Sequence, residues 1–309
     1  MTSSGHSAER INGWTGGQYS LARAGFGLAL ALRFALHAFA APPLEASLHA
    51  TGALAALGFA LGWRERASAF VLAPTLIAAG FLGGERGPGQ VHWLALGVLL
   101  HLGTPPAPFL SLDARGRVDP RGGWSMPQHV RVWALLAFLG SLATWWLSRS
   151  EPLLATLWFA SLCADPAWIA PRAPQGPTWM FYDGSCGLCQ RSVRFVLAEE
   201  APPGTLHFAP LHGEQFARCV DEARARALPD SVVLLEPDGT LLVRSQAALA
   251  LGERMGGAWR VLSLVARGVP RPLRDLAYDA LARVRKRLFA ASKDACPMLP
   301  PDLRARFRA

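Results

Sequence analysis

Six long apolar segments, separated by short polar stretches, occupy the first half of the chain. A membrane-spanning helix needs about 20 mostly apolar residues, and these segments reach or approach that length. In succession they leave too little polar surface for a water-soluble helical bundle. The pattern therefore predicts an all-α polytopic membrane domain of about six helices over residues 19–170. The segments are residues 19–41, 46–62, 67–83, 90–110, 130–148 and 152–170.

The pattern changes after a linker at residues 170–178, whose prolines and glycine continue neither helix nor strand. Beyond it apolar and charged positions alternate, which predicts a second domain over residues 178–309. Its elements follow the order strand, helix, strand, helix, strand, strand, helix, typical of an α/β thioredoxin-like domain. We expect Ser245 to cap the helix that follows the fourth strand. The expected strands are 179–182, 206–211, 231–236 and 240–244, and the later helices are 214–227 and 246–255.

An extra C-terminal helix is expected over residues 273–288, with apolar residues on one face and arginines interleaved among them. One interpretation is a helix that packs on the domain through its apolar face and leaves a basic face in water. The other places that basic side on the anionic cytoplasmic leaflet of a membrane. The net charge of +9 fits lipid contact. No nucleic-acid partner is expected, because the chain has no nucleic-acid-binding motif.

Arginines near the ends of the apolar segments predict the orientation of the chain in the bilayer. Arg64 and Arg66 follow the second segment, three arginines follow the fourth, and Arg172 follows the sixth. The loops on the other side carry at most one arginine each. We therefore expect an integral membrane protein of the bacterial inner membrane with both termini in the cytoplasm.

Several ionisable residues fall within the apolar segments, where such residues are functional candidates. The alternatives are a snorkelling side chain for Arg23 and packing hydrogen bonds for the histidines. Arg33 and His37 are four residues apart and share one helical face. The candidates are Arg33, His37, His92, His101 and Asp165.

A pair of cysteines follows the first expected strand of the second domain. Asp183 and Gly184 turn the chain, Cys186 begins a helix, and Cys189 follows three residues later. The free N–H groups and the dipole of a helix N-terminus favour a thiolate at the first cysteine. The second cysteine is close enough to resolve a mixed disulfide. We expect Cys186 to lie at the surface and to be the most reactive thiol.

Other uses of a C-x-x-C pair are a structural zinc site, a c-type haem and two inert buried thiols. Zinc would need two further ligands, for which Cys219, Cys296, His207 and His212 are the available residues. Haem attachment is excluded because glutamine, not histidine, follows the second cysteine. Neither a metal nor a cofactor is expected. Cys163 and Cys219 are expected to be packing residues.

The stretches "FYDGSCGLC", "SVVLLEPDGTLLVRSQAAL" and "PRPLRDLAYDALARVRKRLFAASKDAC" resemble the DCC family of thioredoxin-like thiol–disulfide oxidoreductases. The Asp, Cys, Cys pattern of that family falls on Asp183, Cys186 and Cys189. The late Cys296 matches a recurrent C-terminal position, which implies an auxiliary thiol. The stretches "NGWTGGQYSLARAGFGLALALRFALH" and "GGWSMP" make the first domain similar to the horizontally transferred transmembrane domain family.

These observations predict a membrane-anchored thiol–disulfide oxidoreductase of the protein-disulfide reductase type, acting on protein or small-molecule thiols and disulfides. Cys186 would attack, Cys189 would resolve, and Asp183 would hold the turn or help to move a proton. The alternative is a membrane transporter or lipid-interacting protein whose thioredoxin-like domain senses redox state or binds a partner. The ionisable residues within the apolar segments are the reason for that alternative.

Overall fold

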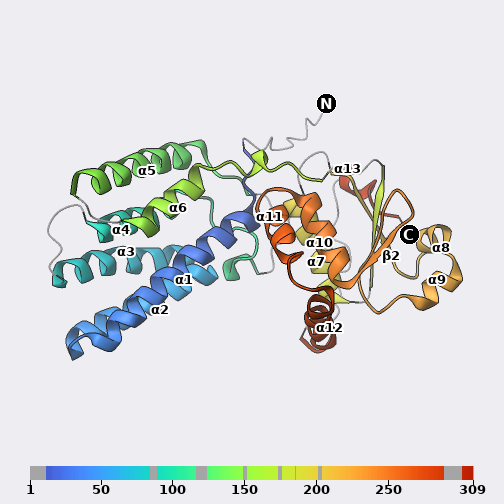
Figure 1. The fold of residues 1–309 in the computed structure, drawn as a ribbon, viewed down its shortest axis with the longest axis horizontal. Helices are drawn as coiled ribbons and strands as arrows, with labels where there is room; N and C mark the ends of the chain where they lie inside the picture. Colours follow the sequence, from blue (N-terminus) through green and yellow to red (C-terminus); the bar gives the residue numbers. More distant parts are fainter. Residues whose placement is uncertain are drawn as a thin grey trace. The chain divides into compact units, whose positions relative to one another are not determined.

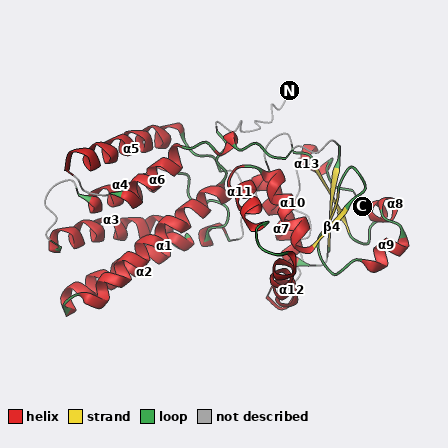
Figure 2. Ribbon diagram, viewed as in Figure 1, coloured by secondary structure: helices red, strands yellow, loops and turns green. Residues whose placement is uncertain are grey.

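A computed structural model describes residues 12–83, 89–115, 124–148, 152–172, 176–184, 186–200, 204–288 and 301–308. The chain forms two compact units, and along the sequence the main change from one to the other falls between Asp165 and Pro166. The first unit is helical, and the second combines a sheet with helices (Figures 1 and 2).

Among the described residues of the first unit there are six α-helices, and each packs against the next along the chain. Four of them, α1, α2, α3 and α5, are long and apolar enough to cross a membrane. Figure 1 shows these helices running alongside one another. The helices are α1 (Gly16–Ala40), α2 (Pro43–Leu61), α3 (Glu65–Leu82), α4 (Gln90–Leu100), α5 (Gln128–Ser148) and α6 (Leu153–Cys163).

The fourth and sixth helices are shorter than the sequence pattern predicts. Helix α4 has 11 residues and passes into a 3₁₀ turn at His101–Gly103 instead of continuing to residue 110. Helix α6 also has 11 residues and ends at Cys163 instead of reaching residue 170. Prolines lie shortly beyond both ends, at Pro105 and Pro166, and proline cannot donate the backbone hydrogen bond that a continuing helix needs. Apolar composition therefore extended past the points where the backbone stops being helical.

Both the interior and the outer surface of the first unit are apolar. Phe39 and Leu44 are almost fully exposed, and leucines, phenylalanines and tryptophans are exposed along every one of the six helices. Between the helices, Phe59 and Phe159 are completely buried in a single core. Soluble proteins rarely expose apolar patches of this extent. The distribution is compatible with helices whose outer faces contact lipid.

The second unit is built on a four-stranded mixed sheet in the order β2-β1-β3-β4. Strand β1 pairs in parallel with β2 and antiparallel with β3, which pairs antiparallel with β4. Figure 2 shows the strands in yellow. The strands are β1 (Thr178–Tyr182), β2 (Leu206–Pro210), β3 (Val233–Leu235) and β4 (Leu241–Val243). All four expected strands are confirmed.

Each face of the sheet has its own layer of helices, because side chains alternate along a strand. Met180 of β1 packs with α7 (Gly187–Glu199) and α10 (Arg244–Met255) on one face. Its neighbour Phe181 packs on the other face, against Phe216 of α8 (Glu214–Cys219). This arrangement confirms the thioredoxin-like fold class.

Two expectations about helix ends were wrong. The helix expected over residues 214–227 is interrupted at Val220, and Asp221 caps a separate helix α9 (Glu222–Ala227) by accepting a hydrogen bond from the N–H of Arg224 (2.8 Å). Ser245 does not cap α10, which begins one residue earlier. Its hydroxyl instead donates to Asp275 (2.5 Å). A capping side chain can also bond a distant carboxylate, and the sequence does not show which it chooses.

Three further helices lie toward the C-terminus in the described part of the chain. They are α11 (Gly257–Ala266), α12 (Arg271–Leu288) and α13 (Pro301–Arg304), of which only α12 was expected.

Near the end of the chain, Phe307 forms a parallel bridge with Phe208 of β2, which covers the open edge of that strand. The N–H of Phe208 donates to the carbonyl of Arg306 (2.9 Å), and the N–H of Arg308 donates back to Phe208 (3.0 Å).

Candidate functional sites

The two cysteines lie where strand β1 passes into helix α7. Cys186 is the N-cap residue of α7 and has an extended backbone, and Cys189 lies in the first turn. A tight turn joins the strand to the helix, because the N–H of Cys186 donates to the carbonyl of Asp183 (3.2 Å). This turn fixes the first sulfur at the helix N-terminus, as predicted.

The sulfur of Cys186 acts as the cap of the helix. It accepts a hydrogen bond from the N–H of Cys189 at 3.4 Å. The first N–H groups of a helix have no partner within the helix, and the positive end of the helix dipole lies there. A thiolate at Cys186 would therefore receive both a hydrogen bond and a favourable electrostatic field.

Both cysteines are buried, which corrects the expectation that the first thiol lies at the surface. Cys186 is 5% exposed and Cys189 is 3% exposed. A side-chain hydrogen bond from Gln190 to the carbonyl of Gly184 (2.8 Å) helps to hold the turn before α7. A strand–turn–helix junction therefore does not by itself leave the first thiol exposed.

The sequence did not identify Gln190 as part of this site. It served there only to exclude haem attachment. Its amide clamps the turn that carries both Asp183 and Cys186. Asp183 itself is partly buried, and its backbone carbonyl closes the turn. A polar side chain one residue after a C-x-x-C pair faces back along the helix, so the spacing could have indicated this contact.

The remaining cysteines lie away from this pair or outside the described residues. Cys219 ends α8, accepts a hydrogen bond from Gln215 (3.1 Å) and packs on the opposite face of the sheet. Cys163 packs against the core of the first unit. Cys296, the expected auxiliary thiol, lies outside the described residues, so its role stays a prediction. Within the described ranges, no three His, Cys, Asp or Glu side chains gather to hold a metal ion.

Two of the ionisable residues in the first unit belong to buried pairs. Arg23 does not snorkel, because its side chain is buried and forms an ion pair with Glu65 at the start of α3. His101 is hydrogen-bonded to the hydroxyl of Tyr19 at 2.8 Å, which confirms the packing role considered for it. These contacts join helices that lie far apart in the sequence.

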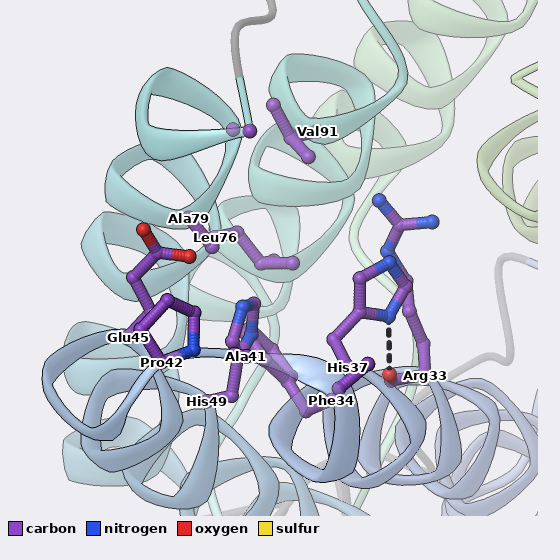
Figure 3. Close-up of a pocket in the computed structure, with 13 residues that line it drawn as sticks. Arg33, Phe34, His37, Ala41, Pro42, Glu45, His49, Leu76, Ala79 and Val91 are labelled. Atoms are coloured by element: carbon purple, nitrogen blue, oxygen red, sulfur yellow. Dashed lines mark hydrogen bonds between the residues drawn. The ribbon is translucent and has the colours of Figure 1, made fainter.

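Arg33 and His37 instead line a cavity of about 330 Å³ in the first unit (Figure 3). They share it with His49 and Glu45 of α2. The imidazole rings of His37 and His49 are 5.5 Å apart. The Nδ1 of His49 is buried and accepts or donates no hydrogen bond among the described residues. Apolar side chains complete the wall, namely Phe34, Leu76, Ala79 and Val91. The cavity therefore combines charged and histidine side chains with apolar ones.

Comparison with known proteins identifies relatives of the second unit. Residues 180–291 match the family described as DCC1-like thiol-disulfide oxidoreductase. The uncharacterized protein YuxK of Bacillus subtilis (strain 168) is 31% identical over 132 residues, which cover 41% of this chain and 91% of that protein. No solved structure shows a significant match. The residues matched to the family begin within β1, at Met180, and include both cysteines.

Proposed function

Because the chain belongs to the DCC1-like thiol-disulfide oxidoreductase family, we propose that it is a membrane-anchored enzyme that reduces disulfides through Cys186 and Cys189. The observation that carries this proposal is the hydrogen bond from the N–H of Cys189 to the sulfur of Cys186. It places the first sulfur where a helix N-terminus stabilises negative charge. The second thiol lies within the same helical turn.

The reaction consists of two thiol–disulfide exchanges. The thiolate of Cys186 attacks one sulfur of the substrate disulfide, a mixed disulfide forms, and the other substrate sulfur leaves as a thiolate. The thiolate of Cys189 then attacks the sulfur of Cys186, and the second substrate sulfur leaves. Two electrons pass to the substrate, and Cys186 and Cys189 end as a disulfide. A dithiol donor restores them. Asp183 holds the turn or moves the proton of the resolving thiol.

Membrane anchoring is supported by the four long apolar helices and by the apolar outer surface of the first unit. The arginines that follow α2, Arg64 and Arg66, favour the cytoplasm for that end of the helix. The same rule places both termini and the second unit in the cytoplasm. Because cytoplasmic thiols are kept reduced, this placement favours reduction as the direction of exchange.

A trapping experiment with the full chain tests the proposal. Cys189→Ser should accumulate mixed disulfides with substrate, because the resolving thiol is missing, whereas Cys186→Ser should form none and lose disulfide reductase activity. Cys219→Ser is the matched control and should behave like the unaltered chain. Equal trapping by Cys189→Ser and by the double variant Cys186→Ser/Cys189→Ser would show that this pair is not the redox centre.

A second candidate function is supported by the cavity that Arg33, His37 and His49 line. The first unit would bind or move a ligand with a polar head and an apolar body, and the second unit would sense redox state. In the full chain, Arg33→Gln should then abolish binding or transport of that ligand, whereas Cys186→Ser should leave it intact. The reverse result would favour the oxidoreductase.

A further inference from the structure

Helix α12 packs against the rest of the second unit through its polar face. The hydroxyl of Tyr278 accepts a hydrogen bond from the N–H of Val232 (3.1 Å), and Asp275 accepts from the hydroxyl of Ser245 (2.5 Å). Asp279 forms an ion pair with Arg244 (3.2 Å). This orientation is the reverse of the expected one, in which the apolar face packs on the domain.

The apolar face of α12 consequently points away from the unit. Leu273, Leu276 and Leu281 are each more than half exposed. Positions 273, 276, 277, 280 and 281 lie on one side of a helix, because residues three and four apart are neighbours on its surface. An amphipathic helix normally buries this side. The structure therefore leaves a continuous apolar stripe uncovered.

Helix α11 carries exposed apolar residues of its own. Trp259 holds its inner face, with its indole ring against Phe195 (5.0 Å between centroids) and its N–H bonded to Glu199 (2.8 Å). The outer face and the connection to α12 are exposed and apolar. We call the exposed apolar residues of α11, of the connection and of α12 together the docking face. It consists of Val261, Leu262, Leu264, Val265, Val269, Leu273, Leu276 and Leu281.

Arginines border the docking face. Arg274 precedes Leu281 by seven residues and Arg283 follows Leu276 by seven, so each lies two helical turns from a stripe leucine and near an edge of the stripe. Arg267 and Arg271, in and after the α11–α12 connection, are exposed but are already paired with Glu253 (2.6 Å) and Asp275 (3.4 Å), so among the described residues Arg274 and Arg283 supply the unpaired positive charge at the border. An apolar strip between arginines is the distribution expected of a helix pair that lies in the interface of a bilayer.

We propose that the docking face lies on an anionic phospholipid surface, with its leucines and valines among the acyl chains and the bordering arginines at the lipid phosphates. The bordering arginines favour an anionic surface as the partner, because each arginine near such a surface contributes an attraction that a neutral partner does not supply. The placement near a bilayer rests on the membrane anchoring proposed above. It does not depend on the redox activity of the cysteines.

The second unit can be tested by itself. It has its own buried cores on the two faces of the sheet. The match to YuxK covers 91% of that protein, so a chain that is little more than this domain exists alone. Residues 166–309 are therefore a suitable fragment for vesicle binding.

Sedimentation with vesicles of phosphatidylglycerol and phosphatidylcholine should capture this fragment at low salt, and vesicles of phosphatidylcholine alone should capture much less. The double variant Val265→Gln/Leu276→Gln should lose the binding. Arg274→Gln/Arg283→Gln should weaken it by roughly fivefold for each arginine removed. The matched control Arg218→Gln/Arg226→Gln removes two exposed arginines from α8 and α9 and should bind within twofold of the unaltered fragment. Circular dichroism melting confirms that each variant is folded.

Four outcomes would overturn the proposal. Equal capture by neutral vesicles, or no capture by anionic vesicles at low salt, would remove the anionic surface as the partner. A stripe-dependent dimer of the fragment in solution, abolished by Val265→Gln/Leu276→Gln, would assign the docking face to a second copy. The full chain in anionic nanodiscs gives a further test. If hydrogen exchange throughout α11 and α12 is as fast in nanodiscs as in detergent, the docking face does not lie on the lipid surface. Failure of the redox proposal changes none of these readouts.

Discussion

Arg23 of α1 and Glu65 of α3 form an ion pair in which the side chains are 1% and 2% exposed. The second carboxylate oxygen of Glu65 accepts the N–H of Ala107 at 2.6 Å. Gly62, which ends α2 with a φ of 64°, completes the surroundings, because a Cβ at this position would lie 2.3 Å from the Arg23 guanidinium. The pair therefore fixes α1, the turn between α2 and α3, and the segment after α4 in one arrangement.

Breaking this pair should be costly. Glu65→Gln leaves the Arg23 guanidinium buried without its counter-charge, and we expect a loss of about 3–5 kcal/mol in the free energy of unfolding. Denaturant titration of the full chain in mixed micelles measures it. Arg115→Gln, at an exposed arginine of the same unit, should change the stability by less than about 0.5 kcal/mol. A similar small change for Glu65→Gln would mean that Arg23 reaches solvent.

The burial of the cysteine pair predicts a specific order of alkylation. In the fragment 166–309 carrying Cys296→Ser, the partly exposed Cys219 should react with a maleimide before Cys186 and Cys189. Mild denaturant should raise the rates at Cys186 and Cys189 most, because their turn must open first. Mass mapping after brief labelling gives the order. Labelling of Cys186 first, without denaturant, would show that the closed turn opens readily in solution.

The attachment of α12 should depend on pH through Asp275. The hydrogen bond from the Ser245 hydroxyl, aided by the Arg271 guanidinium, holds the pKa of Asp275 below its usual value of 3.8. A carboxylate with a lowered pKa in the folded state contributes stability above its unfolded pKa. That contribution is lost as pH falls through the folded pKa.

Asp275→Asn should therefore reduce stability by about 1 kcal/mol at pH 6, and the difference should shrink as pH falls below 3.8. Thermal melts of the fragment 166–309 across this range provide the measurement. Glu222→Gln, at a largely exposed carboxylate of α9, should show no comparable pH dependence. A constant difference at every pH would assign the effect to packing.

The C-terminal segment should stabilise the edge of the sheet. Arg306 forms a buried ion pair with Glu200, whose other oxygen accepts the N–H groups of Thr205 (2.7 Å) and Leu206 (3.1 Å). Arg306→Gln should lower the free energy of unfolding by about 3 kcal/mol, because Glu200 keeps its charge without its partner. Arg308→Gln, two residues later and exposed, is the control. Equal stability of the two variants would mean that the segment adds nothing to the sheet edge.

The sequence by itself determined the features that depend on local pattern. Apolar length predicted the helices of the first unit, and alternation predicted four strands in their observed positions. The spacing of Cys186 and Cys189 after β1 predicted a thiol at the start of α7. These features follow from propensity and periodicity within a few residues, which is why they can be read along the chain.

Tertiary structure decided the features that depend on distant partners. Arg23 pairs with Glu65 across 42 positions of sequence, so its local apolar surroundings suggested snorkelling wrongly. Leu276 is exposed because Asp275, Tyr278 and Asp279 find polar partners on the domain, and periodicity alone cannot show which face of an amphipathic helix is covered. Cys186 is buried although it begins a helix directly after a strand and a turn. In each case the outcome depends on which groups packing brings together, and one-dimensional patterns do not specify that choice.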